Sequence, residues 1–169
     1  MLIALSGLPG TGKTTFARCL ARRLAAQHLR IDTIEEVMLA DSNDALVDGG
    51  AGYRVAFAIA ADNLRLGATV IADSVNPIGL TREAWRGVAS RAGVPIVHVM
   101  LICSDSAEHK KRIESRPAGT RGFDWSEVQS RSIEAADREF VVIDTSHRTV
   151  EHCVEALVKV LSTASRQVP

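Results

Sequence analysis

Short apolar runs alternate along the chain with longer stretches in which apolar residues recur at helical spacing. The short runs are predicted as strands over residues 2–6, 28–32, 69–73, 95–103 and 140–144. The longer stretches are predicted as helices, and in the first of them, over about 13–27, Phe16 and Leu20 share one face with Leu24. Strands that alternate with helices indicate a parallel sheet covered on both faces, which is an α/β fold.

Polar residues mark where some of the predicted helices begin and end. Thr33 and Glu36 have the spacing of a capping box, so a helix is predicted to begin at Thr33, directly after the second strand. Residues 41–50 are polar and contain glycine, which predicts a loop. A later helix is predicted from Trp125 to about Asp137.

The composition fits one globular domain, and we expect a single domain over residues 1–169. Apolar residues make up 46% of the chain, but no apolar run approaches the ~20 residues of a membrane-spanning helix. Basic and acidic residues number 20 each, so no field of one sign is expected to attract a long polyanion or a membrane surface. The three scattered cysteines lack metal-ligand spacing, which favours reduced thiols and a cytoplasmic location.

The segment after the first strand fits the phosphate-binding pattern G-x-x-x-x-G-K-[ST] at every fixed position. With the next threonine, its predicted nucleotide-binding residues are Gly7, Leu8, Pro9, Gly10, Thr11, Gly12, Lys13, Thr14 and Thr15. Glycines let backbone N–H groups wrap round phosphate oxygens, and the following helix adds its positive N-terminal end. Lys13 is expected to contact the β- and γ-phosphates in catalysis, and the Thr14 hydroxyl to bind Mg²⁺. The motif thus predicts ATP and Mg²⁺ as ligands and a three-layer P-loop NTPase fold with a five-stranded parallel sheet.

Motifs of two other P-loop classes are absent from the sequence. A GTPase is expected to carry Asn-Lys-x-Asp after a late strand, where this chain has Val-Ile-Asp-Thr-Ser over residues 142–146. The Leu-Ser-Gly-Gly-Gln signature of transporter ATPases is also absent, and the chain is too short to include a large mechanical module. Eliminating these classes favours a small phosphotransferase. The sequence only weakly distinguishes ATP from GTP as its nucleotide.

Two aspartates fall at the predicted carboxyl ends of strands, where ligands of open α/β sheets gather. Asp73 follows an apolar run, as in a Walker B element, and would bind Mg²⁺ directly or through its water. The alternative role for Asp73 is to start a turn. Asp32 ends the second predicted strand and could take the proton from an attacking hydroxyl. The alternative role for Asp32 is to cap the next helix, although Thr33 already supplies that cap.

These elements together resemble the small P-loop kinases of the polynucleotide-kinase and zeta-toxin kind. The resemblance rests on the P-loop, on Asp32 and on the sequence Asp-Ser-Val-Asn-Pro over residues 73–77. Residues 31–38 are also similar to the corresponding part of chloramphenicol phosphotransferase. The resemblance implies transfer of the ATP γ-phosphate to a hydroxyl, with Asp32 as the catalytic base. It leaves the acceptor open, because these relatives phosphorylate sugars, antibiotics, nucleotides and nucleic-acid ends.

A lid is predicted at about residues 116–131. Residues 116–124 contain one proline, two glycines and two arginines, which suggests a mobile segment. Arg112 and Arg116 are four residues apart and are expected to share one helical face. In the related kinases a lid at this place brings arginines to the transferring phosphoryl group, so the resemblance implies catalytic roles for both. The alternative is a solvated basic surface at a helix C-terminus.

The acceptor is expected to be a hydroxyl-bearing small molecule that approaches near Asp32. Candidate walls are Glu35, Tyr53, Arg54 and Asn76, and the five histidines are interpreted as structural or solvent-facing. Two other functions stay open: a 5′-hydroxyl polynucleotide kinase, and a regulatory ATPase that does not act as a kinase. Nucleic acid is possible but not favoured as a partner, because the net charge is zero, and no membrane partner is expected.

Overall fold

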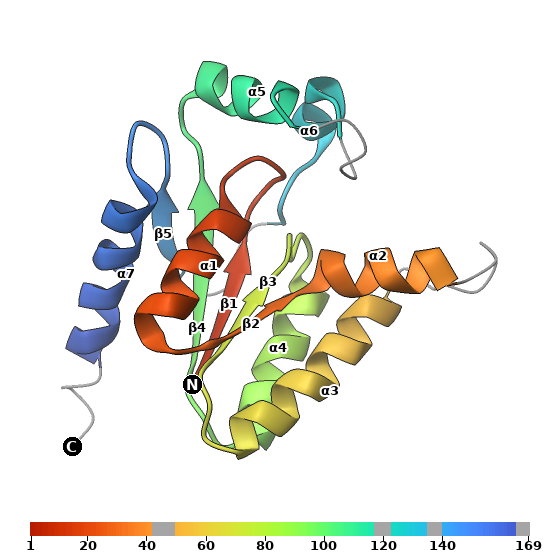
Figure 1. Cartoon of the computed structure of the whole chain (residues 1–169), viewed down its shortest axis with the longest axis vertical. Helices are drawn as coiled ribbons and strands as arrows, with labels where there is room; N and C mark the ends of the chain where they lie inside the picture. The colour runs from red at the N-terminus through yellow and green to blue at the C-terminus, as the bar shows by residue number, and fades with distance from the viewer. Residues whose placement is uncertain (42–49, 117–122, 135–139, 165–169) are drawn as a thin grey trace.

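The computed structural model describes residues 1–41, 50–116, 123–134 and 140–164. Its centre is a five-stranded sheet in the order β2-β3-β1-β4-β5, in which every pair of neighbouring strands is parallel. The strands are β1 (Leu2–Ser6), β2 (Gln27–Arg30), β3 (Val70–Asp73), β4 (Ile96–Ile102) and β5 (Val141–Asp144). Helices cover both faces of the sheet (Figure 1). The predicted α/β fold, with three layers around five parallel strands, is confirmed.

The side chains of the central strand β1 alternate between two hydrophobic cores. Ile3 and Leu5 pack with residues of α1 (Lys13–Leu24) and α7 (Val150–Ala164) on one face of the sheet. Leu2 and Ala4 pack on the other face with residues of α3 (Ala51–Arg65) and α4 (Gly79–Arg91). All residues of β1 are buried, as expected of a strand in a parallel sheet with helices on both sides. The two cores fix β1 firmly, and the P-loop begins where β1 ends.

The second strand and the helix after it begin earlier than predicted. β2 ends at Arg30, and α2 (Ile31–Asp41) follows without a loop. Asp32 therefore lies in the first turn of α2, and the prediction that it ends a strand is wrong. Ile31 is 2% exposed and belongs to the core beneath α3 and α4, so packing of this side chain sets the start of the helix. Thr33 consequently lies within α2, where its hydroxyl accepts a hydrogen bond of 3.3 Å from Arg30.

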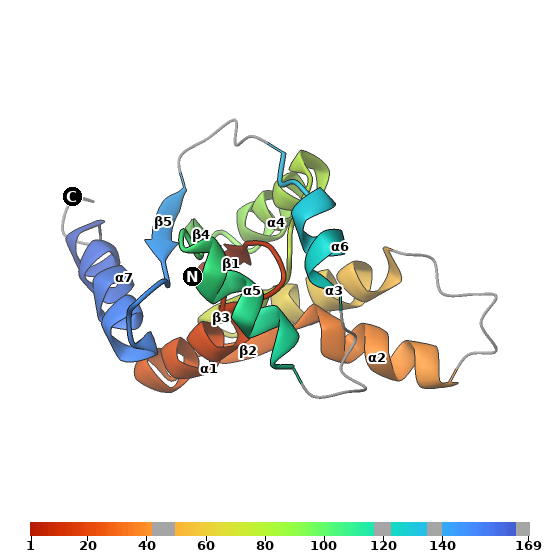
Figure 2. The ribbon, with the colours of Figure 1, turned by 90° about the horizontal axis from the view of Figure 1, so that it is seen from above.

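Two short helices lie above the carboxyl ends of the strands, α5 (Ser106–Glu114) and α6 (Trp125–Ser130) (Figures 1 and 2). Asp105 caps α5, because its side chain accepts a hydrogen bond of 2.8 Å from the Glu108 backbone N–H. α6 begins with a capping box between Asp124 and Glu127 and ends at Ser130, well before the predicted end near Asp137. Residues 131–134, which follow α6, are not helical, and Arg131 has extended backbone angles.

The segment Arg131 to Glu134 is tied to the loop that follows β3. The Glu134 backbone N–H donates to the Pro77 carbonyl at 2.8 Å, and a Glu134 carboxylate oxygen accepts from the Gly79 N–H at 2.6 Å. These bonds satisfy the backbone N–H groups of Glu134 and Gly79. They also place the end of α6 beside the carboxyl end of the sheet.

Parts of three sequence predictions lie outside the described residues. These are most of the loop over 41–50, the centre of the predicted lid at 117–122, and the last residues of the helix predicted over 125–137. The mobility predicted for residues 116–124 therefore stays a prediction. Across the described part of the chain, none of the helices has both the length and the apolar character to cross a membrane.

Candidate active site

The P-loop is shaped by three glycines with positive φ angles, which other residues rarely adopt. Gly10 and Gly12 have φ angles of 87° and 89°, and Gly7 has a φ of 150°. A Cβ on Gly7 would collide with the backbone carbonyl of Leu101 on β4. A Cβ on Gly12 would meet nothing closer than 3.9 Å, so there the backbone angle alone favours glycine. The loop conformation is therefore specified locally and by close contact with the sheet.

Lys13 is the first residue of α1 and is 9% exposed. Its Nζ donates hydrogen bonds to the carbonyls of Gly7 at 2.8 Å and Leu8 at 2.9 Å. Burial lowers the pKa of Lys13 to about 8, and the carboxylates of Asp73 and Asp32 oppose this shift. The ammonium group is thus bound only by two neutral carbonyl oxygens of the P-loop, at the N-terminal end of α1, where anions bind. A triphosphate would offer it far stronger acceptors.

Asp73 ends β3 and is 2% exposed, in the register position beside Arg30 of β2. Its Oδ2 lies 3.0 Å from Nε2 of His28, on the neighbouring strand. The carboxylate and the Thr14 hydroxyl both border the same cavity. Mg²⁺ in phosphate sites prefers oxygen ligands and binds through one or two protein groups plus water and phosphate. Thr14 and Asp73 fit that requirement, and no larger cluster of acidic, His or Cys side chains suited to a metal occurs within the described residues.

Asp32 projects from the first turn of α2 into this cavity and is half exposed. Its Oδ2 lies 3.1 Å from a guanidinium nitrogen of Arg30, which also approaches Glu36 at 3.8 Å. Partial burial lowers the pKa of Arg116, and the nearby Asp32 carboxylate opposes that shift. Asp32 is therefore an accessible carboxylate near two arginines, Arg30 and Arg116, and it lies close enough to Lys13 to oppose the lowering of the Lys13 pKa.

Most of the residues predicted for the site border one open cavity of about 1700 Å³. The cavity is lined by Leu8, Pro9, Gly10, Gly12, Lys13, Thr14, Thr15, Asp32, Asp73, Arg112 and Arg116 among others. Gly7 and Thr11 are predicted site residues that do not line it. The Thr11 hydroxyl instead donates to the Leu8 carbonyl at 2.9 Å, which braces the loop from behind. The fold thus gathers into one hollow residues from four separate parts of the sequence.

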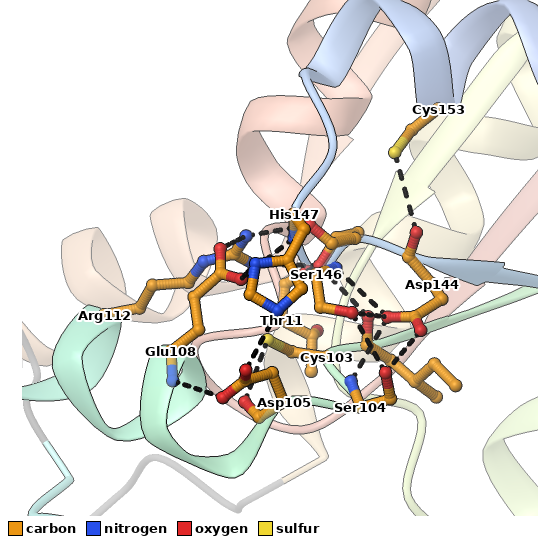
Figure 3. Close-up of polar contacts among 12 residues, drawn as sticks. Thr11, Cys103, Ser104, Asp105, Glu108, Arg112, Asp144, Ser146, His147 and Cys153 are labelled. Atoms are coloured by element: carbon orange, nitrogen blue, oxygen red, sulfur yellow. Dashed lines mark hydrogen bonds and ion pairs between the residues drawn. The ribbon is translucent and has the colours of Figure 1, made fainter.

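Arg112 and Arg116 do not share a helical face as the sequence predicts. α5 ends at Glu114, so Arg116 lies beyond the helix and approaches Asp32. Arg112 instead donates to the hydroxyl and the carbonyl of Thr145, both at 2.8 Å. It also donates to a carboxylate oxygen of Glu108 (Figure 3). The two arginines therefore lie in different regions of the cavity: Arg116 lies toward Asp32, and Arg112 lies toward the turn after β5.

The turn after β5 contains a polar cluster that sequence reasoning missed (Figure 3). The Asp144 carboxylate accepts hydrogen bonds from the backbone N–H and hydroxyl groups of both Ser104 and Ser146, at 2.5 to 3.1 Å. These bonds hold the pKa of Asp144 far below its usual range. The Thr145 hydroxyl bonds to the carbonyl of Thr11 at 3.0 Å. The cluster thereby joins the ends of β4 and β5 to the P-loop.

Two of the five histidines, which the sequence analysis interprets as structural or solvent-facing, contact residues of the site. His28 contacts Asp73, as described above. His109 is buried, and its Nε2 lies 2.7 Å from the Pro9 carbonyl, so α5 supports the P-loop directly. No sequence motif predicts either contact. The His28 contact depends on strand register, and the His109 contact depends on the packing of α5 against the P-loop. His28 could have been suspected only from its position on a strand beside the Walker B strand.

Three of the four residues predicted as walls of an acceptor site, Glu35, Tyr53 and Arg54, line the half of the cavity next to α3. Tyr53 and Phe57 of α3 form one wall, with ring centroids 5.9 Å apart. The Tyr53 hydroxyl accepts a hydrogen bond of 3.3 Å from the backbone N–H of Asn76, and burial raises the pKa of Tyr53. Asn76 itself is fully buried and donates to the Leu5 carbonyl at 2.7 Å, so it supports the wall from behind.

Comparison with known proteins finds kinases over almost the whole chain. The "probable adenylyl-sulfate kinase" of Aeropyrum pernix is 27% identical over 175 residues, which cover 93% of this chain and 90% of that protein. A solved structure from Chloroflexus aurantiacus, described as a candidate kinase, has a TM-score of 0.75 at 24% identity, with 96% of each chain covered. The Mycobacterium tuberculosis APS kinase in complex with AMPPNP and APS has a TM-score of 0.70 at 17% identity, covering 95% of this chain and 96% of that one.

The two solved structures are too distant in sequence to show more than a common fold. That fold is the P-loop NTPase-like arrangement of a five-stranded parallel sheet with flanking helices. A family model described as "AAA domain" matches residues 2–156, from the first strand into the last helix. On that match, which spans the P-loop, Asp73 and the turn after β5, the chain belongs to the AAA domain family.

Proposed function

We propose that the protein is an ATP-dependent phosphotransferase that moves the γ-phosphate to a hydroxyl of a small molecule. The observation that carries this proposal is the single cavity that joins the P-loop, Asp73 and Asp32. Its volume of about 1700 Å³ exceeds the roughly 300–1,000 Å³ of a site for one small ligand. Nucleotide and acceptor would therefore have room to meet within one hollow.

The proposed roles follow from the positions of the groups. The loop N–H groups, the N-terminus of α1 and Lys13 would bind the β- and γ-phosphates. Thr14 and Asp73 would hold Mg²⁺, which supplies charge neutralisation on the phosphates when bound. The acceptor hydroxyl oxygen would form a bond to the γ-phosphorus while the bond from that phosphorus to the bridging oxygen of ADP breaks. Asp32 would accept the hydroxyl proton, and Arg116 would stabilise the negative charge in transfer.

The similarity to kinases supports this reading. The relative from Aeropyrum pernix is named as a kinase of adenylyl sulfate, and one solved neighbour binds AMPPNP with APS. The finer resemblance to polynucleotide kinase, zeta toxin and chloramphenicol phosphotransferase stays part of the proposal. All three cysteines, Cys19, Cys103 and Cys153, are free thiols, in keeping with the proposed cytoplasmic location.

The deciding experiment is a screen for transfer of labelled γ-phosphate from ATP. Acceptors would include sugars, sugar acids, nucleosides and 5′-hydroxyl oligonucleotides, with the Lys13→Ala variant as the inactive control. We expect at least one small hydroxyl compound to be labelled by the wild-type protein alone. Labelling of oligonucleotides only would favour the polynucleotide kinase. Release of inorganic phosphate, with no acceptor labelled, would favour the regulatory ATPase.

A further inference from the structure

Arg131 lines the cavity and makes no ion pair with a carboxylate in the described part of the chain. Two other arginines of the cavity have acidic neighbours. Arg30 lies 3.1 Å from Asp32 and 3.8 Å from Glu36, and the Asp32 carboxylate also opposes the lowering of the Arg116 pKa. The positive charge of Arg131 is therefore available to a ligand.

The guanidinium group of Arg131 is held in place before any ligand arrives. Its central carbon lies 3.7 Å from the ring centroid of Phe123, so the group stacks on the ring. Such stacking fixes the plane of the guanidinium and leaves its N–H groups free to donate in a fork. Phe123 lines the same cavity, and so does Ser132.

The backbone around Arg131 is fixed on both sides. α6, which precedes it, begins with the capping box of Asp124 and Glu127. The segment after it is tied to the loop following β3 by the two hydrogen bonds of Glu134. Arg131 therefore lies in a segment that is held at both ends, close to Pro77 and Ile78, which also line the cavity. A ligand would gain affinity here because little side-chain entropy remains to be lost.

We propose that Arg131 binds a carboxylate or phosphate group that the acceptor carries in addition to its reacting hydroxyl. The acceptor is then an anionic hydroxyl compound, such as a sugar acid or sugar phosphate, and Arg131 determines that specificity. This inference rests on the proposed function for its reacting hydroxyl. Planar, bidentate recognition of carboxylate or phosphate is the task for which arginine is better suited than lysine.

The first test measures anion binding without any reaction. The P-loop is saturated with Mg²⁺ and AMPPNP, so that an added anion cannot occupy it, and inorganic sulfate is titrated as the probe by NMR. We expect sulfate to perturb the wild-type protein saturably, and Arg131→Ala to weaken its binding by about tenfold or more. Arg131→Lys should recover only part of the affinity, because the stacked fork is lost. Arg65→Ala is the matched control, since Arg65 is an exposed arginine of α3 paired with Asp62 outside the cavity.

The second test compares acceptors in matched pairs, gluconate with glucose and ribose 5-phosphate with ribose. We expect anionic members to be preferred in the transfer assay, and Arg131→Ala to lower kcat/KM for them while the affinity for MgATP is unchanged. Absence of sulfate binding, or equal binding in wild type and Arg131→Ala, would overturn the anion site. Efficient phosphorylation of neutral sugars with no effect of Arg131→Ala would also overturn it and leave the kinase standing. Sulfate binding that depends on Arg131, with no acceptor ever labelled, would retain the anion site and refute the kinase.

Discussion

Binding of MgATP should take up a proton at alkaline pH, and Lys13 is the group that gains it. Burial lowers the pKa of this ammonium from 10.5 to about 8 in the free protein. At about 1.4 kcal/mol per pKa unit, the charged form is disfavoured by about 3–4 kcal/mol relative to water. The γ-phosphate brings negative charge to the site and reverses that penalty. Lys13 is therefore fully charged in the complex but only half charged in the free protein near pH 8.

The expected magnitude follows from that difference. Uptake should be close to zero at pH about 6.5, about half a proton at pH 8 and about 0.9 at pH 9, and the affinity should approach a tenfold loss per pH unit above 8. Calorimetry of MgATP binding in buffers of different ionisation enthalpy measures the uptake directly. Lys13→Met is the control and should show weak binding without this uptake. Uptake below about 0.1 proton at pH 9, or the same uptake in Lys13→Met, would refute the reasoning.

Three further changes test other parts of the site. Asp32→Asn should keep the affinity for MgATP and lose phosphoryl transfer by about 10²-fold or more, measured in single turnovers; a near wild-type rate would make Asp32 structural. Arg116→Ala should lower kcat more than it weakens MgATP binding, because the charge that it stabilises grows during transfer; the reverse pattern in steady-state kinetics would contradict this. Asp144→Asn should lower the free energy of unfolding by about 2 kcal/mol in urea titrations at neutral pH. Because the pKa of Asp144 is lowered in the folded protein, this stabilisation is present above the ordinary carboxyl pKa and is lost as the pH falls below it. A variant as stable as wild type at neutral pH would show that the hydrogen bonds of Asp144 do not stabilise the fold.

The fold and the P-loop could be predicted because their signals are local. A continuous apolar strand, three glycines at fixed spacing and the lysine that follows dictate conformation and chemistry over eight residues. Element boundaries were less predictable where packing or backbone geometry decides them. α1, for example, ends at Leu24 because Ala25 adopts a left-handed conformation with φ 50°, which a residue other than glycine rarely does.

The rest of the site depends on contacts between residues distant in sequence. Asp32 was identified as a candidate although its element was wrong, because strand end and first helical turn both point to the same edge of the sheet. The bond from His28 to Asp73 spans 45 residues and exists only because β2 pairs with β3 in one register. The separation of Arg112 from Arg116 follows from where α5 stops and from Thr145, 33 residues away from Arg112. No spacing rule connects such pairs.

The order of the strands also bears on how the protein avoids association through its sheet. β2 and β5 are the outer strands, and each comprises four residues. A free strand edge is a template for another chain, and short edges limit the backbone that such a chain could pair with. β2 also leads directly into α2, the helix that carries Asp32. An added strand could therefore pair with β2 only over these four residues. The short length of β2, which places Asp32 at the cavity, therefore also protects the sheet against edge-to-edge aggregation.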